Sequence, residues 1–311
     1  MQKKILIALD GSPSSDHAVD YVGLMEGAII KDLWVTLFFV MKPVPPFLRR
    51  EGRSDPALFR QLQTLEAKNR AEARRVLDRQ VQRLEGHGLS PERIEAKAQP
   101  WASGVARDIL FEAEQGLYDA VVLGRRGLSK AQELFVGSVT NKVVQHAERL
   151  PVWIVGGRVK SHKVLCAVDG SEGSLKAVDH MAFMLGGNPD CEITLFHVGA
   201  SLANYCPLEF EGEVKEEIEG ELMTSDSQCM DDFYSRALKV LAEGGISPEQ
   251  VTTRTREGVI SVPRAILEEM RRGGYGTVVL GRRGENRSFF LGHVSDKVVA
   301  KGEGAAVWVV G

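Results

Sequence analysis

The chain contains a long internal repeat. Residues 4–22 (KILIALDGSPSSDHAVDYV) and 163–181 (KVLCAVDGSEGSLKAVDHM) are identical at ten of 19 positions, with a constant offset of 159. The stretches YDAVVLGRRG, from Tyr118, and YGTVVLGRRG, from Tyr275, are identical at eight of ten positions. A period of about 157 residues is too long for a solenoid repeat, and 311 residues are enough for two ordinary domains. The sequence therefore predicts a duplicated domain, with copies at residues 1–157 and 162–311.

Within each copy, strand-like and helix-like patterns alternate. In the first copy, KKILIALD, WVTLFFVM, RIEAKAQ, YDAVVLG and PVWIVG are typical of strands, and a segment with three prolines after the second strand is expected to be a loop. A helical pattern of Ala18, Val19, Val22 and Met25 follows the first strand, and the other helical stretches are the arginine-rich RAEARRVLDRQVQRLEG, VARDILFEAEQ and SVTNKVVQHAE. Continuously apolar strands separated by helices predict a parallel sheet covered on both faces. We expect a doubly wound α/β fold with about five strands per copy.

Charge argues against a general nucleic-acid binder. The net charge is −3, made up of +3 in residues 1–157 (22 basic against 19 acidic) and −6 in the remainder (17 against 23). In the arginine-rich stretch, Val76, Leu77, Val81 and Leu84 share one helical face, so its arginines are expected mostly on the solvated face. The four cysteines, all in the second half, lack the paired C-x-x-C spacing of a zinc ribbon or a disulfide framework.

The N-terminus is expected to be a strand. MQKKILIALDGS has a strand-length apolar run and no small-residue cleavage site, and no apolar run reaches the ~20 residues of a membrane span. We therefore expect a cytoplasmic protein with no membrane partner. Trp34, Trp153 and Trp308 lie in strand-like runs and are expected in the core or at an interface.

A glycine-rich segment follows the fourth strand. GRRGLSKAQELFVGS runs from Gly124 to Ser138 and leads into the helical stretch VTNKVV. Glycines allow backbone N–H groups to converge on an anion, and the first turn of a helix attracts phosphate. Ser138 is expected to cap that helix. The segment is thus a candidate phosphate-binding loop, although a strand-to-helix connection with ordinary capping has the same ingredients.

The pattern Gly124-x2-Gly127-x9-Gly137-Ser138, after VVL and before VTNKVV, resembles the ATP-binding signature of the universal stress protein family. The likeness extends to ILIALDGS at the start and PVWIV at the end of the copy, so it covers nearly the whole chain. It implies a five-stranded flavodoxin-like sheet of the adenine-nucleotide α-hydrolase-like group. It also implies an internal pseudo-dimer in which the last strands of the two copies pair; association with another chain as a homodimer stays open.

The resemblance also implies roles for individual residues. Asp10 would contact the nucleoside, with Ala8 and Leu9 beside the adenine and the backbone of Val40 at its edge. The ribose and phosphates would be lined by Leu123, Gly124, Arg126 and Gly127, and the terminal phosphates by Gly137, Ser138, Val139 and Thr140. Asp10-Gly11-Ser12 is equally a good turn and helix cap, and Arg125 and Arg126 are equally plain surface charges.

The second copy departs from this pattern. Gly281-x2-Gly284 is followed by seven residues before Gly292, and His293 stands in the place of Ser138, whereas Asp169 and Val198 match Asp10 and Val40. An acidic stretch, Glu209 to Glu221, follows the second strand of this copy; it is expected to be solvated rather than to approach the pocket. We therefore expect ATP mainly in the first copy.

Function is narrowed by what is missing. The sequence has no Walker P-loop, no protein-kinase signature and no histidine pair with metalloprotease spacing. We therefore predict no catalytic residues and no protein-held metal, although Mg²⁺ or Mn²⁺ could accompany ATP. The expected function is an ATP-binding stress-response or signalling protein with an unknown protein partner, in which hydrolysis is slow at most. The alternative is a nucleotide-independent dimerisation or scaffold module of the same family.

Overall fold

The structure, a computed structural model, describes residues 2–51, 54–125, 137–199, 213–282 and 292–311. The first copy contains strands β1 (Lys3–Leu9), β2 (Leu33–Met41), β3 (Ile94–Pro100), β4 (Ala120–Gly124) and β5 (Val152–Val155). Its helices are α1 (Pro13–Ala28), α2 (Pro46–Glu51), α3 (Pro56–Gly86), α4 (Val105–Gln115) and α5 (Ser138–His146), with a 3-10 turn at Pro91–Arg93. Strands and helices alternate as the periodicity predicts.

The second copy repeats this order. Its strands are β6 (Val164–Val168), β7 (Ile193–Val198), β8 (Val251–Arg256), β9 (Thr277–Gly281) and β10 (Ala306–Val310). Its helices are α6 (Glu172–Leu185), α8 (Glu213–Glu243), α9 (Val262–Gly273) and α10 (His293–Lys301), with a 3-10 turn at Pro248–Gln250. The described part of the acidic stretch, residues 213–221, belongs to α8 and not to a loop.

All strands belong to one ten-stranded sheet with the order β3-β2-β1-β4-β5-β10-β9-β6-β7-β8. Neighbours within each copy run parallel, for example Ala8 opposite Phe38 and Leu123. The two copies join where β5 and β10 pair antiparallel, with Trp153 opposite Trp308. The predicted α/β fold class is confirmed, and the last strands pair as the resemblance implies.

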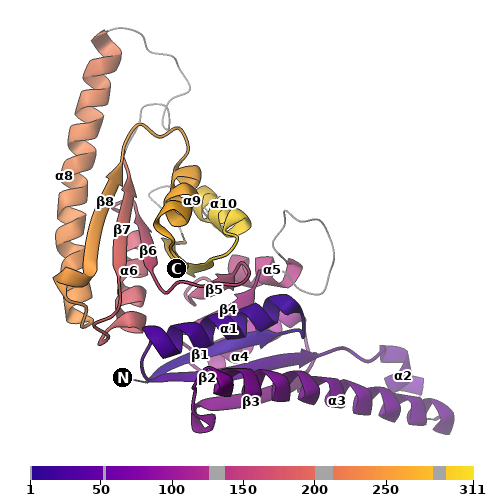
Figure 1. The fold of residues 1–311 in the computed structure, drawn as a ribbon. Helices are drawn as coiled ribbons and strands as arrows, with labels where there is room; N and C mark the ends of the chain where they lie inside the picture. Colours follow the sequence, from indigo (N-terminus) through magenta and orange to yellow (C-terminus); the bar gives the residue numbers. More distant parts are fainter. Residues whose placement is uncertain (1, 52–53, 126–136, 200–212, 283–291) are drawn as a thin grey trace.

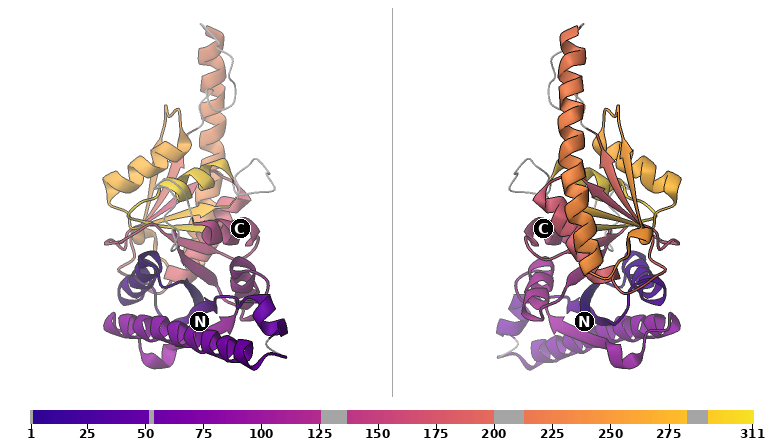
Figure 2. Two further views of the ribbon diagram at one scale, coloured as in Figure 1. Left: turned by 90° about the vertical axis from the view of Figure 1, so that its right-hand side faces the viewer. Right: turned by 90° about the vertical axis from the view of Figure 1, so that its left-hand side faces the viewer.

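Helices cover both faces of this sheet (Figure 1). One apolar core, shared by both copies, lies under α1, α3, α6 and α8, and a second lies under α4, α5, α9 and α10. The helices α3 and α8 each have 31 residues and run past the end of the sheet (Figure 2). Both cores are therefore continuous across the boundary between the copies.

The structure corrects one local expectation and sharpens two others. The proline-containing segment after β2 is not wholly a loop, because it contains α2. Trp34 is 38% exposed on β2, so it is not a core residue. The arginines of this stretch are mostly exposed, as expected, but Arg83 is half-buried and pairs with Asp20 at 2.8 Å and with Asp16 at 3.5 Å, which ties α3 to α1.

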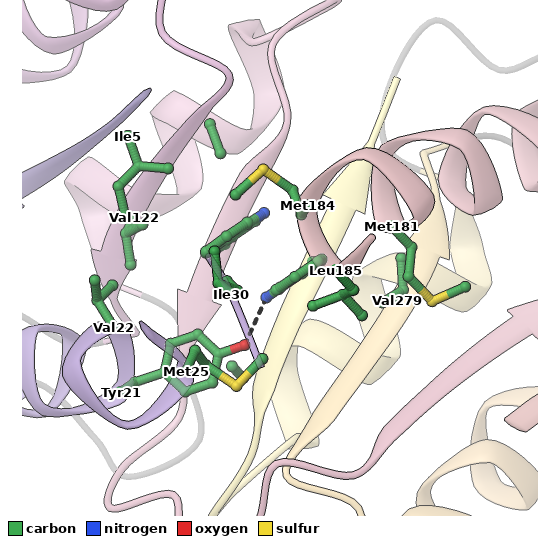
Figure 3. Packing of buried hydrophobic residues seen from close by; sticks show 14 of the residues in the cluster. Ile5, Tyr21, Val22, Met25, Ile30, Val122, Met181, Met184, Leu185 and Val279 are labelled. Atoms are coloured by element: carbon green, nitrogen blue, oxygen red, sulfur yellow. Dashed lines mark hydrogen bonds between the residues drawn. The ribbon is translucent and has the colours of Figure 1, made fainter. Parts of the chain in front are cut away.

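An aromatic cluster fills the junction of the copies. The rings of Trp153 and Trp308 stack with centroids 3.9 Å apart, and both side chains are fully buried, as predicted. Each indole N–H crosses to the other copy: that of Trp153 donates to His180 Nε2 on α6 at 3.1 Å, and that of Trp308 donates to the Tyr21 hydroxyl on α1 at 2.8 Å. Figure 3 shows Tyr21 from α1 facing Leu185 and Met184 from α6 across this junction.

Burial changes the acid–base behaviour of the cluster. Loss of hydration lowers the pKa of His180 to about 3 and raises that of Tyr21. His180 is therefore neutral at physiological pH, with Nε2 free to accept the indole hydrogen.

The helices in the described part of the chain include none with the length and apolar character of a membrane-spanning segment.

Candidate functional site

The predicted ligand residues lie at the carboxyl edge of the first half-sheet. Because Ala8 is opposite Leu123 in the parallel register, the residues after β1 and β4 are neighbours at that edge. The side chains of Ala8, Val40 and Leu123 share the core under α4 and α5, and Val40 is only half-buried. The carboxyl edge of an open α/β sheet is where such folds bind ligands.

The turn from β1 into α1 is built around Asp10. The Asp10 carboxylate accepts a hydrogen bond from the Ser12 N–H at 2.9 Å, and Gly11 takes a positive φ of 77° that favours glycine. Ser12 caps α1, since its hydroxyl accepts from the Ser15 N–H at 3.3 Å. The turn-and-cap interpretation is therefore present, and it leaves the exposed Asp10 carboxylate at the edge with capacity for a further donor.

The two ends of the glycine-rich segment are held together. The Gly137 N–H donates to the Arg125 carbonyl at 2.7 Å, and the Thr140 hydroxyl donates to the Gly124 carbonyl at 2.9 Å. Gly137, not Ser138, is the N-cap of α5, and no described side chain caps this helix. The first N–H groups of α5, from Ser138 to Thr140, thus have no partner within the helix and suit an anion.

Gly124 has a packing role that its place in the motif does not reveal. A Cβ at this position would lie 2.5 Å from the carbonyl carbon and oxygen of Ser14, in the first turn of α1. Gly281 meets Gly173 at the start of α6 in the same way, at 2.7 Å. The first glycine of each motif therefore lets the end of the fourth strand approach the backbone of the first helix of its copy.

The second copy closes its loop in the same manner. The Gly292 N–H donates to the Arg282 carbonyl at 2.9 Å, and the Ser295 hydroxyl donates to the Gly281 carbonyl at 2.8 Å. His293 is the first residue of α10, as Ser138 is of α5. The shorter spacing in this copy therefore does not prevent the loop ends from meeting.

The two candidate carboxylates differ more than the loop ends do. Asp169 Oδ1 accepts from the hydroxyls of Ser171 and Ser174, both at 2.6 Å, and from the Ser171 N–H at 3.2 Å. In the first copy, the Ser15 hydroxyl donates instead to the Ser12 carbonyl at 2.8 Å. Asp169 is thus held by its own turn, whereas Asp10 has fewer described partners.

The remaining predicted residues lie in different surroundings. The side chain of Leu9 is 6% exposed and packs in the core under α1 and α3, on the sheet face opposite Ala8. Val139 is half-buried against the other core, and Val198 of the second copy lies at the end of β7 like Val40 at β2. Arg126, Gly127 and Gly284 lie outside the described residues. No group of three or more His, Cys, Asp or Glu side chains within the described ranges could hold a metal ion.

Sequence reasoning missed the role of Arg125. Its side chain is 5% exposed, and its guanidinium reaches the second copy, where it donates to the Ala300 carbonyl at 3.1 Å and to Glu303 at 2.7 Å. Arg282 in the second copy is 3% exposed and reaches back to the first copy. The repeated GRRG motif was the available signal, but a pair of adjacent arginines looks like surface charge in a sequence.

Comparisons with known proteins agree with this architecture. The family model described as the universal stress protein family matches residues 1–156 and 160–310. A universal stress protein from Archaeoglobus fulgidus DSM 4304 is similar in structure, with 20% identity, coverage of 99% of this chain and 97% of that chain, and a TM-score of 0.65.

Two further relatives match about half of the chain. Universal stress protein YxiE of Bacillus subtilis (strain 168) is 28% identical in an alignment of 148 residues that covers 44% of this chain and 90% of that protein. A universal stress protein family protein from Arabidopsis thaliana with AMP bound is 21% identical, covering 50% of this chain and 92% of that one, with a TM-score of 0.35.

Proposed function

Because the chain belongs to the universal stress protein family, we propose that it binds ATP as a regulatory ligand, mainly in its first copy, and acts as a stress-response or signalling protein. The observation that carries this proposal is the clamp at the base of the glycine-rich segment. The hydrogen bonds from Gly137 to Arg125 and from Thr140 to Gly124 bring the start of α5 beside the end of β4. An uncapped helix N-terminus at the carboxyl edge of the sheet is suited to phosphate.

The remaining groups at this edge suit a nucleoside. Ala8 and Val40 offer apolar surface on one face of the sheet, where a base could lie. The exposed Asp10 carboxylate, fixed by its turn, would accept hydrogen bonds from ribose hydroxyls. Since the Thr140 hydroxyl is used in the clamp, we assign its phosphate contact to the backbone N–H.

The preference for the first copy rests on the two carboxylates and the two helix starts. Asp169 Oδ1 already accepts three hydrogen bonds from its own turn, so a ribose would be left chiefly with Oδ2 of a carboxylate that Ser171 and Ser174 hold in place. Ser138 at the start of α5 places a small hydroxyl beside the phosphates, where His293 places a larger ring at the start of α10.

The proposal includes no dedicated catalytic group. Mg²⁺ or Mn²⁺ would be bound chiefly through the phosphate oxygens of the nucleotide and water. Hydrolysis would be slow, since no general base is assigned to position a water at the terminal phosphate. Nucleotide would then act by changing the surface around the glycine-rich segment, which an unknown protein partner would recognise. The protein is proposed to work in the cytoplasm.

Titration of a fluorescent ATP analogue tests the proposal. Asp10→Ala and Asp169→Ala are a matched pair, because each removes a carboxylate that accepts a hydrogen bond from the N–H two residues later. Asp10→Asn is the control that keeps an acceptor for the Ser12 N–H. Losing a hydrogen bond to a charged group costs about 1.5–3 kcal/mol, so we expect Asp10→Ala to weaken binding about tenfold or more. Asp169→Ala should change it less than twofold or so.

Each other outcome has a definite meaning. Equal losses in the two alanine variants would refute the preference for the first copy. Absence of binding by the wild-type chain would refute ATP as the ligand and favour the nucleotide-independent dimerisation or scaffold function. Nucleotide released from the purified protein and identified by mass spectrometry would decide between ATP and a related adenine nucleotide.

A further inference from the structure

The first arginine of each GRRG motif crosses the boundary between the copies. The Arg125 guanidinium donates to the carbonyl of Ala300, in the last turn of α10, at 3.1 Å. The Arg282 guanidinium donates to the carbonyls of Ala147 and Gln145, at the end of α5, at 2.9 and 2.7 Å. Each arginine thus binds the C-terminal end of the helix that follows the other copy's glycine-rich segment.

The backbones of the same two residues close the loops of their own copies. The Arg125 carbonyl accepts from the Gly137 N–H at 2.7 Å, while its N–H donates to Val155 on the last strand at 2.9 Å. The Arg282 carbonyl accepts from the Gly292 N–H at 2.9 Å, and its N–H donates to Val310 at 2.6 Å. One residue therefore joins a loop base in one copy to a helix end in the other.

The helices complete the connection. The helix α5 starts at Ser138, beside the proposed phosphate site, and ends at His146, next to the carbonyls that Arg282 binds. The helix α10 lies in the same way between the second copy's loop and Arg125. Each has nine residues, a rod of about 14 Å at 1.5 Å per residue. A rod this short moves as a unit, so a shift at one end reaches the other.

The chemistry of the contact favours a strong link. The C-terminal carbonyls of a helix carry partial negative charge, and an arginine there is favourable. Both guanidinium groups are buried, so water screens the attraction weakly, and the planar fork of arginine can bind two acceptors at fixed angles. Arg125 uses Ala300 and the carboxylate of Glu303, and Arg282 uses two carbonyls.

We propose that Arg125 and Arg282 are positioning residues that couple the two candidate nucleotide sites, so that the end of the fourth strand of each copy, at the base of its glycine-rich segment, sets the position of the phosphate-binding helix of the other copy. The inference rests on the proposed nucleotide binding. The coupling adds a reciprocal regulation between the copies to that function. The second copy would influence nucleotide binding in the first copy even if it binds nucleotide weakly itself.

The test uses Arg282→Met in the full chain. This substitution keeps much of the buried volume but removes the donors to the end of α5, and it changes no residue of the first copy. In an Asp169→Ala background, which removes the candidate nucleoside carboxylate of the second copy, we expect about fivefold weaker binding of a fluorescent ATP analogue, at the lower end of usual coupling between sites. The matched control is Arg254→Met, which removes an arginine paired with Glu269 inside the second copy at 2.9 Å.

Amide hydrogen exchange gives a second readout that needs no nucleotide. Loss of the arginine at the C-terminus of α5 should speed exchange in residues 137–146 by about twofold to fivefold. Arg125→Met should do the same in residues 292–301, and Arg254→Met in neither segment. Arg282→Lys keeps the charge without the fork and should give an intermediate effect. If the methionine variant fails to fold, Arg282→Lys takes its place in both measurements.

The possible results separate this inference from the proposed function. If the wild-type chain binds the analogue and both Arg282 variants bind it as tightly, the proposed coupling is wrong, but the proposed function stands. Unchanged exchange at residues 137–146 in the Arg282 variants also overturns it. A wild-type chain that binds no nucleotide overturns the proposed function, and the coupling with it.

Discussion

Acid should weaken the folded state through His180. Its ring is 8% exposed and accepts the indole hydrogen of Trp153 at 3.1 Å, and burial lowers its pKa from the ordinary value of 6.5 to about 3. The folded state therefore keeps the ring neutral at a pH where the unfolded chain protonates it. His180 therefore has no effect on the free energy of unfolding well above pH 6.5, and it lowers this free energy progressively as the pH falls from 6.5 towards 3.

The size of the effect follows from the difference in bound protons. Between the two pKa values the unfolded state binds one more proton, so the free energy of unfolding falls by about 1.4 kcal/mol per pH unit. Between pH 7.5 and pH 5.0 the loss from this group is about 2 kcal/mol. The figure holds for any folded-state pKa well below 5, because only the pH interval below the unfolded value counts.

Urea unfolding followed by tryptophan fluorescence at pH 7.5 and pH 5.0 measures this loss. His180→Gln is the comparison, because a glutamine oxygen can accept the Trp153 hydrogen but does not titrate. We expect the free energy of unfolding of the wild type to fall by about 2 kcal/mol more than that of His180→Gln, while the other histidines contribute equally to both. Equal falls in the two proteins would refute the reasoning.

Two further substitutions test the packing. Trp308→Ala should lower the free energy of unfolding by about 3–5 kcal/mol, because it removes a fully buried ring stacked on Trp153 and leaves the Tyr21 hydroxyl without its donor; a loss below about 1 kcal/mol in urea unfolding would contradict this. Gly124→Ala should destabilise by about 1–3 kcal/mol, because its Cβ would meet the Ser14 backbone at 2.5 Å. Gly86→Ala is its control: it has open space around its Cβ and should stabilise α3 slightly, and similar effects of the two substitutions would argue against the close contact.

Much of the fold follows from the sequence alone. Apolar runs and helical periodicity are local patterns, and they predict strands and helices wherever tertiary contacts do not oppose them. The stretch VARDILFEAEQ is α4 from end to end, and the repeat predicted two similar five-stranded halves, which join into one sheet. Trp34 shows the limit: an apolar run indicates a strand, but it does not say which of its side chains stays at the surface.

The candidate site was also predicted in part from the sequence, while its other features depend on the tertiary structure. Glycine spacing located the loop and its two ends, because a motif is contiguous or nearly so. The hydrogen bonds that hold Asp169 more firmly than Asp10 depend on where the hydroxyls of Ser174 and Ser15 point, which no spacing gives. The need for glycine at position 124 depends on the approach of α1, a contact between the end of β4 and a helix far away in the sequence.

Sequence by itself determined that this chain has two α/β copies, each with a glycine-rich segment after its fourth strand. Only the tertiary structure decided how the copies act on one another. The contacts that join them, Trp153 with His180 and Arg125 with Ala300, link residues 27 and 175 positions apart. Such pairs are created when β5 and β10 meet, and that meeting brings an arginine that looks like surface charge in the sequence into a buried site at the end of the other copy's helix.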